Sequence, residues 1–217
     1  MITAPLAAPE NDLQQAVLVL RQGGVVAFPT ETYYGLAVDP FNSQAVSRLF
    51  ALKRRPAAKP VLALIDGPAR LPLLTVGIPK PFSVLMTAFW PGPLTLIFPA
   101  LPGLSPQLTA GTGTIGLRIS SHPLAGQLCA LAGGAITATS ANRSGTHPAQ
   151  SEQEVVGQFG DEVDWLVRGG STRGGLPSTV IAARQDGGLA LVREGVIPLS
   201  ALAVSLGSQE RILRVEP

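Results

Sequence analysis

The sequence has a single cysteine and few charged residues, and each shortage excludes a class of protein. Because Cys129 stands alone among 217 residues, the chain contains neither an internal disulfide nor a cysteine-rich metal site. Its place in the apolar run LAGQLCALAGG predicts a small core residue. Charged residues make up only 14% of the chain, and the formal net charge is +2. This overall balance does not indicate a nucleic-acid-binding protein.

Long apolar runs are also missing. No segment approaches the roughly 18 consecutive apolar residues of a membrane span. The N-terminal segment MITAPLAAPENDLQQ lacks the basic start and apolar stretch of a signal peptide. We therefore expect a cytoplasmic protein with no membrane attachment.

Both histidines, His122 and His147, precede a proline and lie far apart, so metal-ligand spacing is absent and loop positions are expected.

Hydrophobic residues make up 46% of the chain, which is enough for one substantial core. The length favours a single domain over two small lobes. Helical spacing predicts helices that begin after an Asn11 or Asp12 cap, at Ser43, near residue 81, at 123, after Ser151 and, more weakly, after Pro198. Strands are expected at 25–28, 61–65, 94–99, 114–120, 135–140, 165–170, 178–183 and 189–195. Because the late strands crowd together, a mixed sheet covered by helices is favoured over a purely parallel one.

Positive charge gathers in one segment, KRRPAAKP, and no acidic residue occurs between Asp39 and Asp66. The apolar positions of the preceding helix place Lys53 and Arg54 beyond its apolar face. The cations of this segment can converge on one phosphate chain. On the pattern alone, a solvated basic face and a phosphate site both remain open, and the solvated face is the commoner outcome.

Two further polar islands interrupt apolar strands. The segment TATSANRSG offers Ser140, Asn142 and Ser144 on a turn, and these compact groups suit phosphate or carboxylate oxygens. The segment TIGLRIS buries Arg118 between apolar residues, so we expect a carboxylate partner, from the protein or from a ligand. The string GTGTIG matches a dinucleotide-binding pattern, but a strand follows it instead of a helix, so we reject that function.

The sequence resembles YrdC-type proteins from about residue 11 to 197. The motifs that carry the resemblance, in order, are GGVVAFPTETYYGLAVDP, KRRPAAKP, WPGPLTLIFPA, TIGLRIS, TSANRSG and PSTV with LVREG. The paired K-x-R and S-x-N motifs are together highly specific. The resemblance implies an α/β fold, a twisted mixed sheet flanked by helices around a concave basic cavity. It also implies one YrdC-like domain of the short form over residues 1–217, with residues 198–217 as a C-terminal tail.

Proteins of this type are threonylcarbamoyl-AMP synthases of tRNA modification. The resemblance therefore implies a nucleotidyltransferase that makes threonylcarbamoyl-AMP and pyrophosphate from L-threonine, bicarbonate and ATP, with Mg²⁺ held mainly by the ATP phosphates. A transferase complex would then carry the threonylcarbamoyl group to the adenosine beside the anticodon, and tRNA is a further candidate for direct contact.

The resemblance also implies roles for individual residues. Lys53 and Arg55 would be catalytic. The implied ATP-binding residues are Lys53, Arg55, Lys59, Thr114, Ser140, Asn142 and Arg193. The implied threonine-binding residues are Thr32, Arg118 and Ser178. Longer relatives often carry a histidine toward the threonine where this chain has Leu64.

Two alternatives stay open. A non-catalytic RNA-binding module would use the same basic surface, but aromatic residues make up only 5% of the chain and none lies within KRRPAAK to stack on bases. A paralogous enzyme of the same fold would act on another carbamoyl substrate or in the reverse direction. Retention of the S-x-N motif favours the synthase, since relatives with divergent chemistry tend to have lost it.

Overall fold

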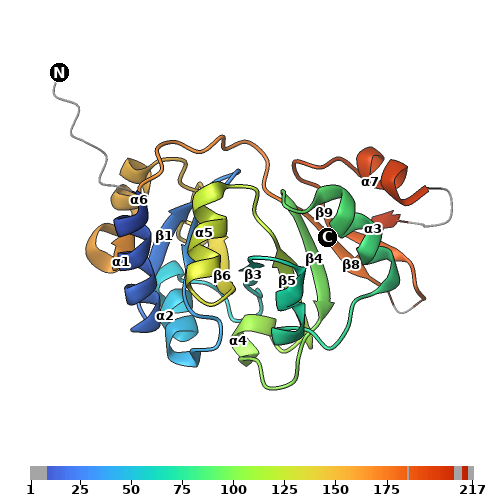
Figure 1. Cartoon of the computed structure of the whole chain (residues 1–217), viewed down its shortest axis with the longest axis horizontal. Helices are drawn as coiled ribbons and strands as arrows, with labels where there is room; N and C mark the ends of the chain where they lie inside the picture. The colour runs from blue at the N-terminus through green and yellow to red at the C-terminus, as the bar shows by residue number, and fades with distance from the viewer. Residues whose placement is uncertain (1–8, 185, 208–211, 215–217) are drawn as a thin grey trace.

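In the computed structural model, which describes residues 9–184, 186–207 and 212–214, ten strands form one sheet. The strand order is β10-β9-β8-β4-β5-β3-β6-β2-β1-β7 (Figure 1). The strands are β1 Val26–Pro29, β2 Tyr34–Ala37, β3 Leu62–Ile65, β4 Leu94–Pro99, β5 Thr114–Arg118, β6 Ala135–Ser140, β7 Trp165–Leu166, β8 Thr179–Ala183, β9 Leu189–Arg193 and β10 Ile212–Arg214. Parallel pairs such as β3 with β5 and β4 with β8 alternate with antiparallel pairs such as β4 with β5 and β3 with β6. The predicted mixed sheet is confirmed.

Helices cover the sheet. They are α1 Pro9–Arg21, α2 Ser43–Lys53, η1 Pro68–Leu73, α3 Lys80–Phe89, α4 Pro106–Thr109, α5 Pro123–Leu131, α6 Glu152–Phe159, η2 Gly160–Glu162 and α7 Leu199–Leu206. Six of them lie where the sequence predicts helices. No helix in the described part of the chain is long and apolar enough to cross a membrane.

The start of α1 differs from the prediction. Asn11 and Asp12 lie inside the helix instead of capping it. The Asp12 carboxylate accepts hydrogen bonds from Trp165 Nε1 at 3.1 Å and from the Arg168 amide at 2.8 Å. Asp12 therefore ties α1 to the β7 edge of the sheet and does not satisfy the amides of its own helix.

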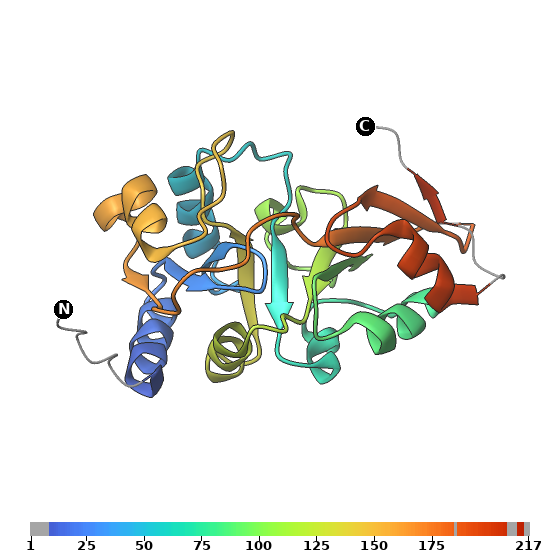
Figure 2. The same cartoon turned by 90° about the horizontal axis from the view of Figure 1, so that it is seen from above.

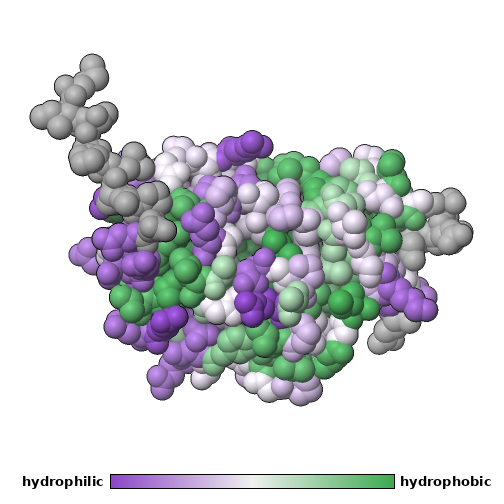
Figure 3. All heavy atoms as spheres, in the orientation of Figure 1, coloured by the Kyte–Doolittle hydropathy of each residue, from purple (hydrophilic) through white to green (hydrophobic). Residues whose placement is uncertain are grey.

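Alternation along the strands divides the core into two clusters. In β1, Val26 and Phe28 point to the face packed by α1 and α5, whereas Ala27, like Val25 just before the strand, points to the face packed by α2. This is the alternation that a strand buried on both faces must show. Strongly hydrophilic side chains gather toward the α1 and α2 end of the molecule in Figure 3, and hydrophobic patches are scattered over the rest of that face.

Two strands were not predicted. The first, β2, has only four residues, and all four are buried. The second, β10, lies within the predicted tail and pairs with β9, so that segment contributes to the sheet. Between β7 and β8 the chain crosses the molecule from one end of the sheet toward the other, as the orange segment in Figure 2 shows. This crossing brings residues 169–178 beside the segment that precedes β2.

Candidate active site

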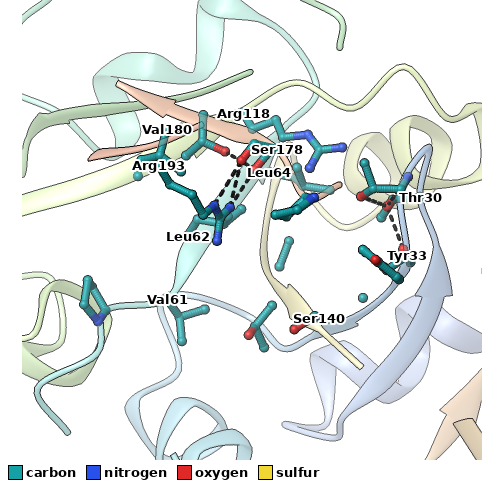
Figure 4. Close-up of a pocket in the computed structure, with 18 of the residues that line it drawn as sticks. Thr30, Tyr33, Val61, Leu62, Leu64, Arg118, Ser140, Ser178, Val180 and Arg193 are labelled. Carbon is teal, nitrogen blue, oxygen red and sulfur yellow. Dashed lines mark hydrogen bonds between the residues drawn. The ribbon is translucent and has the colours of Figure 1, made fainter. Parts of the chain in front are cut away.

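A cavity of about 480 Å³ opens over the centre of the sheet. Seven strands, β2 to β6 with β8 and β9, contribute residues to its lining. Figure 4 shows Thr30 and Tyr33 on one side, Ser178 and Arg193 on the opposite side, and Leu64 between them. Among the described residues that line it, the charged ones are three arginines, Arg55, Arg118 and Arg193. The lining therefore carries positive charge and is suited to an anionic ligand.

The structure brings most of the predicted site residues together. Seven of the ten line this one cavity: Thr32, Arg55, Thr114, Arg118, Ser140, Ser178 and Arg193. Asn142 lies just behind Ser140, whose Oγ donates to Asn142 Oδ1 at 2.5 Å. Lys59 is exposed, and its carbonyl accepts a hydrogen bond from Arg55 Nε at 3.0 Å. The remaining residue, Lys53, is buried behind the lining.

At one end of the cavity, Arg118 meets a carboxylate of the protein itself. Its Nη2 forms an ion pair with Glu31, and its Nε donates to Gly92 O at 3.2 Å. Glu31 also accepts hydrogen bonds from Ser120 Oγ and from the amide of Ser121. Burial alone would raise the pKa of Glu31, but the Arg118 charge and the hydrogen bonds from Arg118 and Ser120 hold it below its ordinary value. The expected carboxylate partner is therefore present without a ligand.

Next to this pair, Arg193 is held by neutral acceptors. Its Nε and Nη2 donate to Ser178 O at 3.2 and 2.9 Å, and Nη2 also donates to Ser178 Oγ at 3.2 Å. Ser178 Oγ lies 2.9 Å from Thr95 Oγ1. Burial, and after it the positive charge of Arg118, lower the pKa of Arg193. The two guanidinium groups thus repel each other, and an anion bound between them would relieve this repulsion.

At the other end, the S-x-N turn follows β6. Arg55 reaches this part of the lining and is held by two backbone carbonyls, those of Lys59 and Pro60 at 3.0 and 2.7 Å. Ser140 also lines the cavity, and both residues lie near Lys53, whose Nζ donates to Ser140 O and whose pKa is lowered by the Arg55 charge. The arrangement places one fixed cation and one hydroxyl at the same end, and a guanidinium and a hydroxyl can both donate hydrogen bonds to phosphate oxygens.

The prediction that Lys53 lies beyond the apolar face of α2 is wrong. Its exposed fraction is 1%, and burial together with the Arg55 charge lowers its pKa to about 7. The reason is helical spacing: Val46, Leu49, Phe50 and Lys53 form one buried stripe. Lys53 continues the apolar face and does not leave it.

Sequence reasoning missed two residues that shape the site. One is Glu31, which is separated from its partner Arg118 by 87 residues, so no local pattern could connect them. The other is Arg143, whose Nη1 donates to Leu52 O at 2.8 Å and whose Nη2 pairs with Glu162. Arg143 also lies over the ring of Phe159. A basic residue directly inside the SANRSG motif was the available signal.

Comparisons with known proteins agree with this geometry. A family model for Sua5, YciO and YrdC proteins, described as "Telomere recombination", matches residues 18–195. The threonylcarbamoyl-AMP synthase of Bacillus subtilis is 39% identical over 186 residues, which are 85% of this chain and 54% of that protein. The enzyme of the same name from Halorhodospira halophila is 40% identical over 157 residues, 72% of this chain and 82% of that protein.

A solved structure is also similar. The crystal structure of Pyrococcus abyssi Sua5 complexed with L-threonine superposes with a TM-score of 0.86 at 35% identity, over 93% of this chain and 58% of that one. The chain thus spans little more than half the length of the Bacillus and Pyrococcus proteins and most of the Halorhodospira protein. The family match, the shared fold and the position of the motifs around one cavity lead to one conclusion: this chain belongs to the Sua5/YciO/YrdC family.

Proposed function

We propose that the chain is an L-threonylcarbamoyladenylate synthase, a nucleotidyltransferase that forms threonylcarbamoyl-AMP and pyrophosphate from L-threonine, bicarbonate and ATP. The observation that carries this proposal is the convergence of the motifs of an amino-acid end and a phosphate end on one arginine-lined cavity. The names of the similar synthases and the threonine held by the Pyrococcus relative support it.

The two ends of the cavity have separate tasks in this proposal. Thr32, Arg118 and Ser178 receive L-threonine at one end. Arg55 and Ser140 receive the ATP phosphates at the other end, with Lys59 at the rim and Asn142 behind Ser140. Thr114 and Arg193 complete the nucleotide site from β5 and β9. Lys53 acts from behind the lining, where its Nζ donates to the carbonyls of Ser140 and Asn142.

The chemistry suits a site without a general base. The amine of threonine and bicarbonate combine to a carbamate with loss of water. One carbamate oxygen, already anionic, attacks the α-phosphorus of ATP, and the bond from that phosphorus to the bridging oxygen breaks to release pyrophosphate. Alignment of the carbamate against ATP provides part of the roughly 7 to 11 kcal/mol available to ideal positioning. The arginines stabilise the negative charge on the phosphates.

Magnesium fits the site as a companion of the nucleotide. In the described part of the chain, no group of three His, Cys, Asp or Glu side chains could hold a metal ion. A protein cage for Mg²⁺ is therefore not offered there, and the donor set leaves the ATP phosphates as its main ligands. When bound with ATP, the ion would neutralise phosphate charge beside Arg55.

The RNA-binding alternative is less well supported. A non-catalytic RNA-binding module does not account for a cavity with separate carboxylate-type and phosphate-type groups.

We further propose that a transferase complex receives the product in the cytoplasm and delivers it to tRNA adenosine. The positive charge of the Arg55 end is the feature available for a tRNA contact.

Release of pyrophosphate from ATP tests the proposal directly. L-threonine and bicarbonate are each omitted in turn, and serine or glycine replaces threonine. We expect release only when L-threonine and bicarbonate are both present, and no requirement for nucleic acid. Equal release with serine, with glycine or with no amino acid would overturn the substrate assignment.

A further inference from the structure

The end of α2 and the S-x-N turn satisfy each other's backbone groups. The last carbonyls of a helix have no partner within the helix. In α2, the carbonyl of Lys53 accepts a hydrogen bond from the amide of Ser144 at 2.8 Å, and that of Leu52 accepts one from Arg143 at 2.8 Å. The turn therefore caps the helix.

The helix in turn holds the turn through the ammonium group of Lys53. Its Nζ donates to the carbonyls of Ser140 and Asn142, the latter at 2.6 Å, and lies 3.5 Å from Asn142 Oδ1. An ammonium has three donors, and it faces three oxygen atoms of one turn. These contacts run in the opposite direction to those of Ser144 and Arg143, so the two segments form one interlocked unit.

Lys53 is also shielded from the cavity. Its exposed fraction is 1%, and it is not one of the residues that line the cavity, whereas Arg55, two residues later, is. The chain turns between them, because Arg54 adopts a left-handed conformation with φ of 50° and ends the helix. As a result the two basic residues of the K-x-R motif point into different surroundings.

We infer that Lys53 is a positioning residue that fixes the backbone of the Ser140–Ser144 turn against the end of α2, and that it does not itself bind the ATP phosphates. To reach a phosphate, the ammonium would have to leave the buried carbonyls of Ser140 and Asn142, and a buried acceptor without its donor is costly. The consequence for ATP rests on the proposed function, whereas the consequence for the turn does not.

A second anchor makes the inference specific to one part of the turn. Gln158 in α6 accepts hydrogen bonds from the amide of Arg143 at 3.2 Å and from Thr146 Oγ1 at 3.0 Å, and it donates to His147 O at 2.8 Å. This anchor does not involve Lys53. Loss of the lysine ammonium should therefore loosen the first half of the turn and leave the second half in place.

The test is amide hydrogen exchange in the protein without any substrate, followed residue by residue by NMR. Lys53→Met removes the ammonium and keeps the length of the side chain, and Lys80→Met, at the exposed start of α3, is the matched control. We expect exchange of the Ala141 and Asn142 amides to rise about tenfold in Lys53→Met, because local opening becomes easier. The Thr146 amide should not change. Lys80→Met should match the wild type throughout.

Kinetics then connect the turn to the reaction. In Lys53→Met the ratio kcat/KM for ATP should fall about ten- to a hundredfold, since Ser140 and Asn142 are no longer held in place. Lys53→Arg keeps the charge but replaces a compact ammonium with a planar group, so exchange should rise there too. It also serves as the second variant if Lys53→Met does not fold.

Two outcomes would overturn the inference. If Lys53→Met weakens ATP binding while exchange at Ala141 and Asn142 stays at the wild-type rate, Lys53 is a direct phosphate ligand. If Lys53→Arg restores full activity with unchanged exchange, only its charge matters. Because exchange is measured without substrate, a chain that failed to make threonylcarbamoyl-AMP would still give a valid result for the turn.

Discussion

Two buried cations serve the cavity, and their surroundings differ. Arg118 has an exposed fraction of 6% and is paired with the Glu31 carboxylate. Lys53 has an exposed fraction of 1% and faces only neutral oxygens, those of Ser140 and Asn142. The charge of Arg118 is therefore balanced within the protein, whereas the charge of Lys53 is not.

The two cations therefore contribute differently to the cavity: Arg118 mainly by the fixed orientation of its side chain, and Lys53 by its charge. A neutralised guanidinium adds little net potential to the cavity, but its planar fork is held in one orientation by Glu31 and Gly92. The Lys53 ammonium is held by the neutral carbonyls of Ser140 and Asn142, and burial followed by the charge of Arg55 lowers its pKa to about 7. The amino-acid end thus carries a charge-balanced arginine held in one orientation. The phosphate end carries Arg55, held by backbone carbonyls, and a lysine whose charge depends on pH near neutrality.

The largest expected effect comes from removing the balancing charge at the amino-acid end. Glu31→Gln leaves Arg118 buried without a carboxylate, and breaking a buried pair from one side is strongly destabilising. We expect the free energy of unfolding to fall by about 3 kcal/mol, measured by urea denaturation.

The matched control is Glu162→Gln. Glu162 also pairs with an arginine, Arg143, but its side chain is 55% exposed. Exposed pairs contribute about 0 to 1 kcal/mol, so the control should remain close to the wild type. A Glu31→Gln protein as stable as this control would show that Arg118 does not depend on its partner, and the contrast between the ends would fail.

The next effect concerns the phosphate end. Arg55→Ala removes the cation that lines the cavity there, and a charge-assisted hydrogen bond is worth about 1.5 to 3 kcal/mol. We expect pyrophosphate release to fall roughly ten- to a hundredfold at equal ATP concentration. Arg54→Ala, one residue earlier and exposed, should keep the wild-type rate. Near-full activity of Arg55→Ala at saturating ATP would show that the basic segment does not bind the ATP phosphates and acts only as a solvated basic face.

A smaller effect is expected from Arg118→Lys, which keeps the charge and loses the planar fork. The lysine can still pair with Glu31, so the protein should stay folded. Threonine affinity should fall by about 1 to 2 kcal/mol, as when one strong hydrogen bond is replaced by a weaker contact. ATP affinity should change little. Calorimetric titration with each ligand measures both affinities. If ATP affinity fell as much as threonine affinity, Arg118 would belong to the nucleotide end of the cavity and not to the amino-acid end.

The sequence was sufficient for the parts of the fold whose signal is local. β4, β5 and β6 are apolar runs bounded by turns. The helix α2 is capped by Asn42, whose side chain accepts from the Gln44 and Ala45 amides. β2 was missed because four buried residues that follow a polar segment show neither a long apolar run nor alternation. The cap of α1 was wrong because Asp12 is used by Trp165 and Arg168, far away in the chain.

The site shows the same division. The motifs located the residues that line the cavity, since each motif lies on, or at the end of, a strand or helix that reaches it. They did not give the environment of Lys53. A lysine that continues the apolar face of a helix is expected to extend its ammonium toward solvent. Here the ammonium stays buried because it donates to carbonyls of a turn that begins 87 residues later. Burial of a charge depends on tertiary partners that no local pattern contains.

The last expected effect is a pH dependence of stability that has the same sign at the two ends but falls in different pH ranges. The folded pKa of Glu31 lies below its ordinary value of 4.5, so its contribution to stability is complete above 4.5 and is lost as the pH falls through the lower folded value. The folded pKa of Lys53, about 7, lies below its ordinary value of 10.5. Between these two values the unfolded chain binds more protons than the folded one, so stability rises with pH.

Urea denaturation at a series of pH values, in the wild type, Glu31→Gln and Lys53→Met, separates the two contributions. The advantage of the wild type over Glu31→Gln should shrink below pH 4.5 and stay constant at neutral pH. The wild type should gain on Lys53→Met as the pH rises from 7 toward 10.5, because only the wild type releases the buried proton. A wild-type curve parallel to that of Lys53→Met through this range would mean that the carbonyls of Ser140 and Asn142 keep the ammonium protonated. In that case the three donated hydrogen bonds outweigh the cost of burying the charge, and the phosphate end would hold its positive potential at every pH at which the protein works.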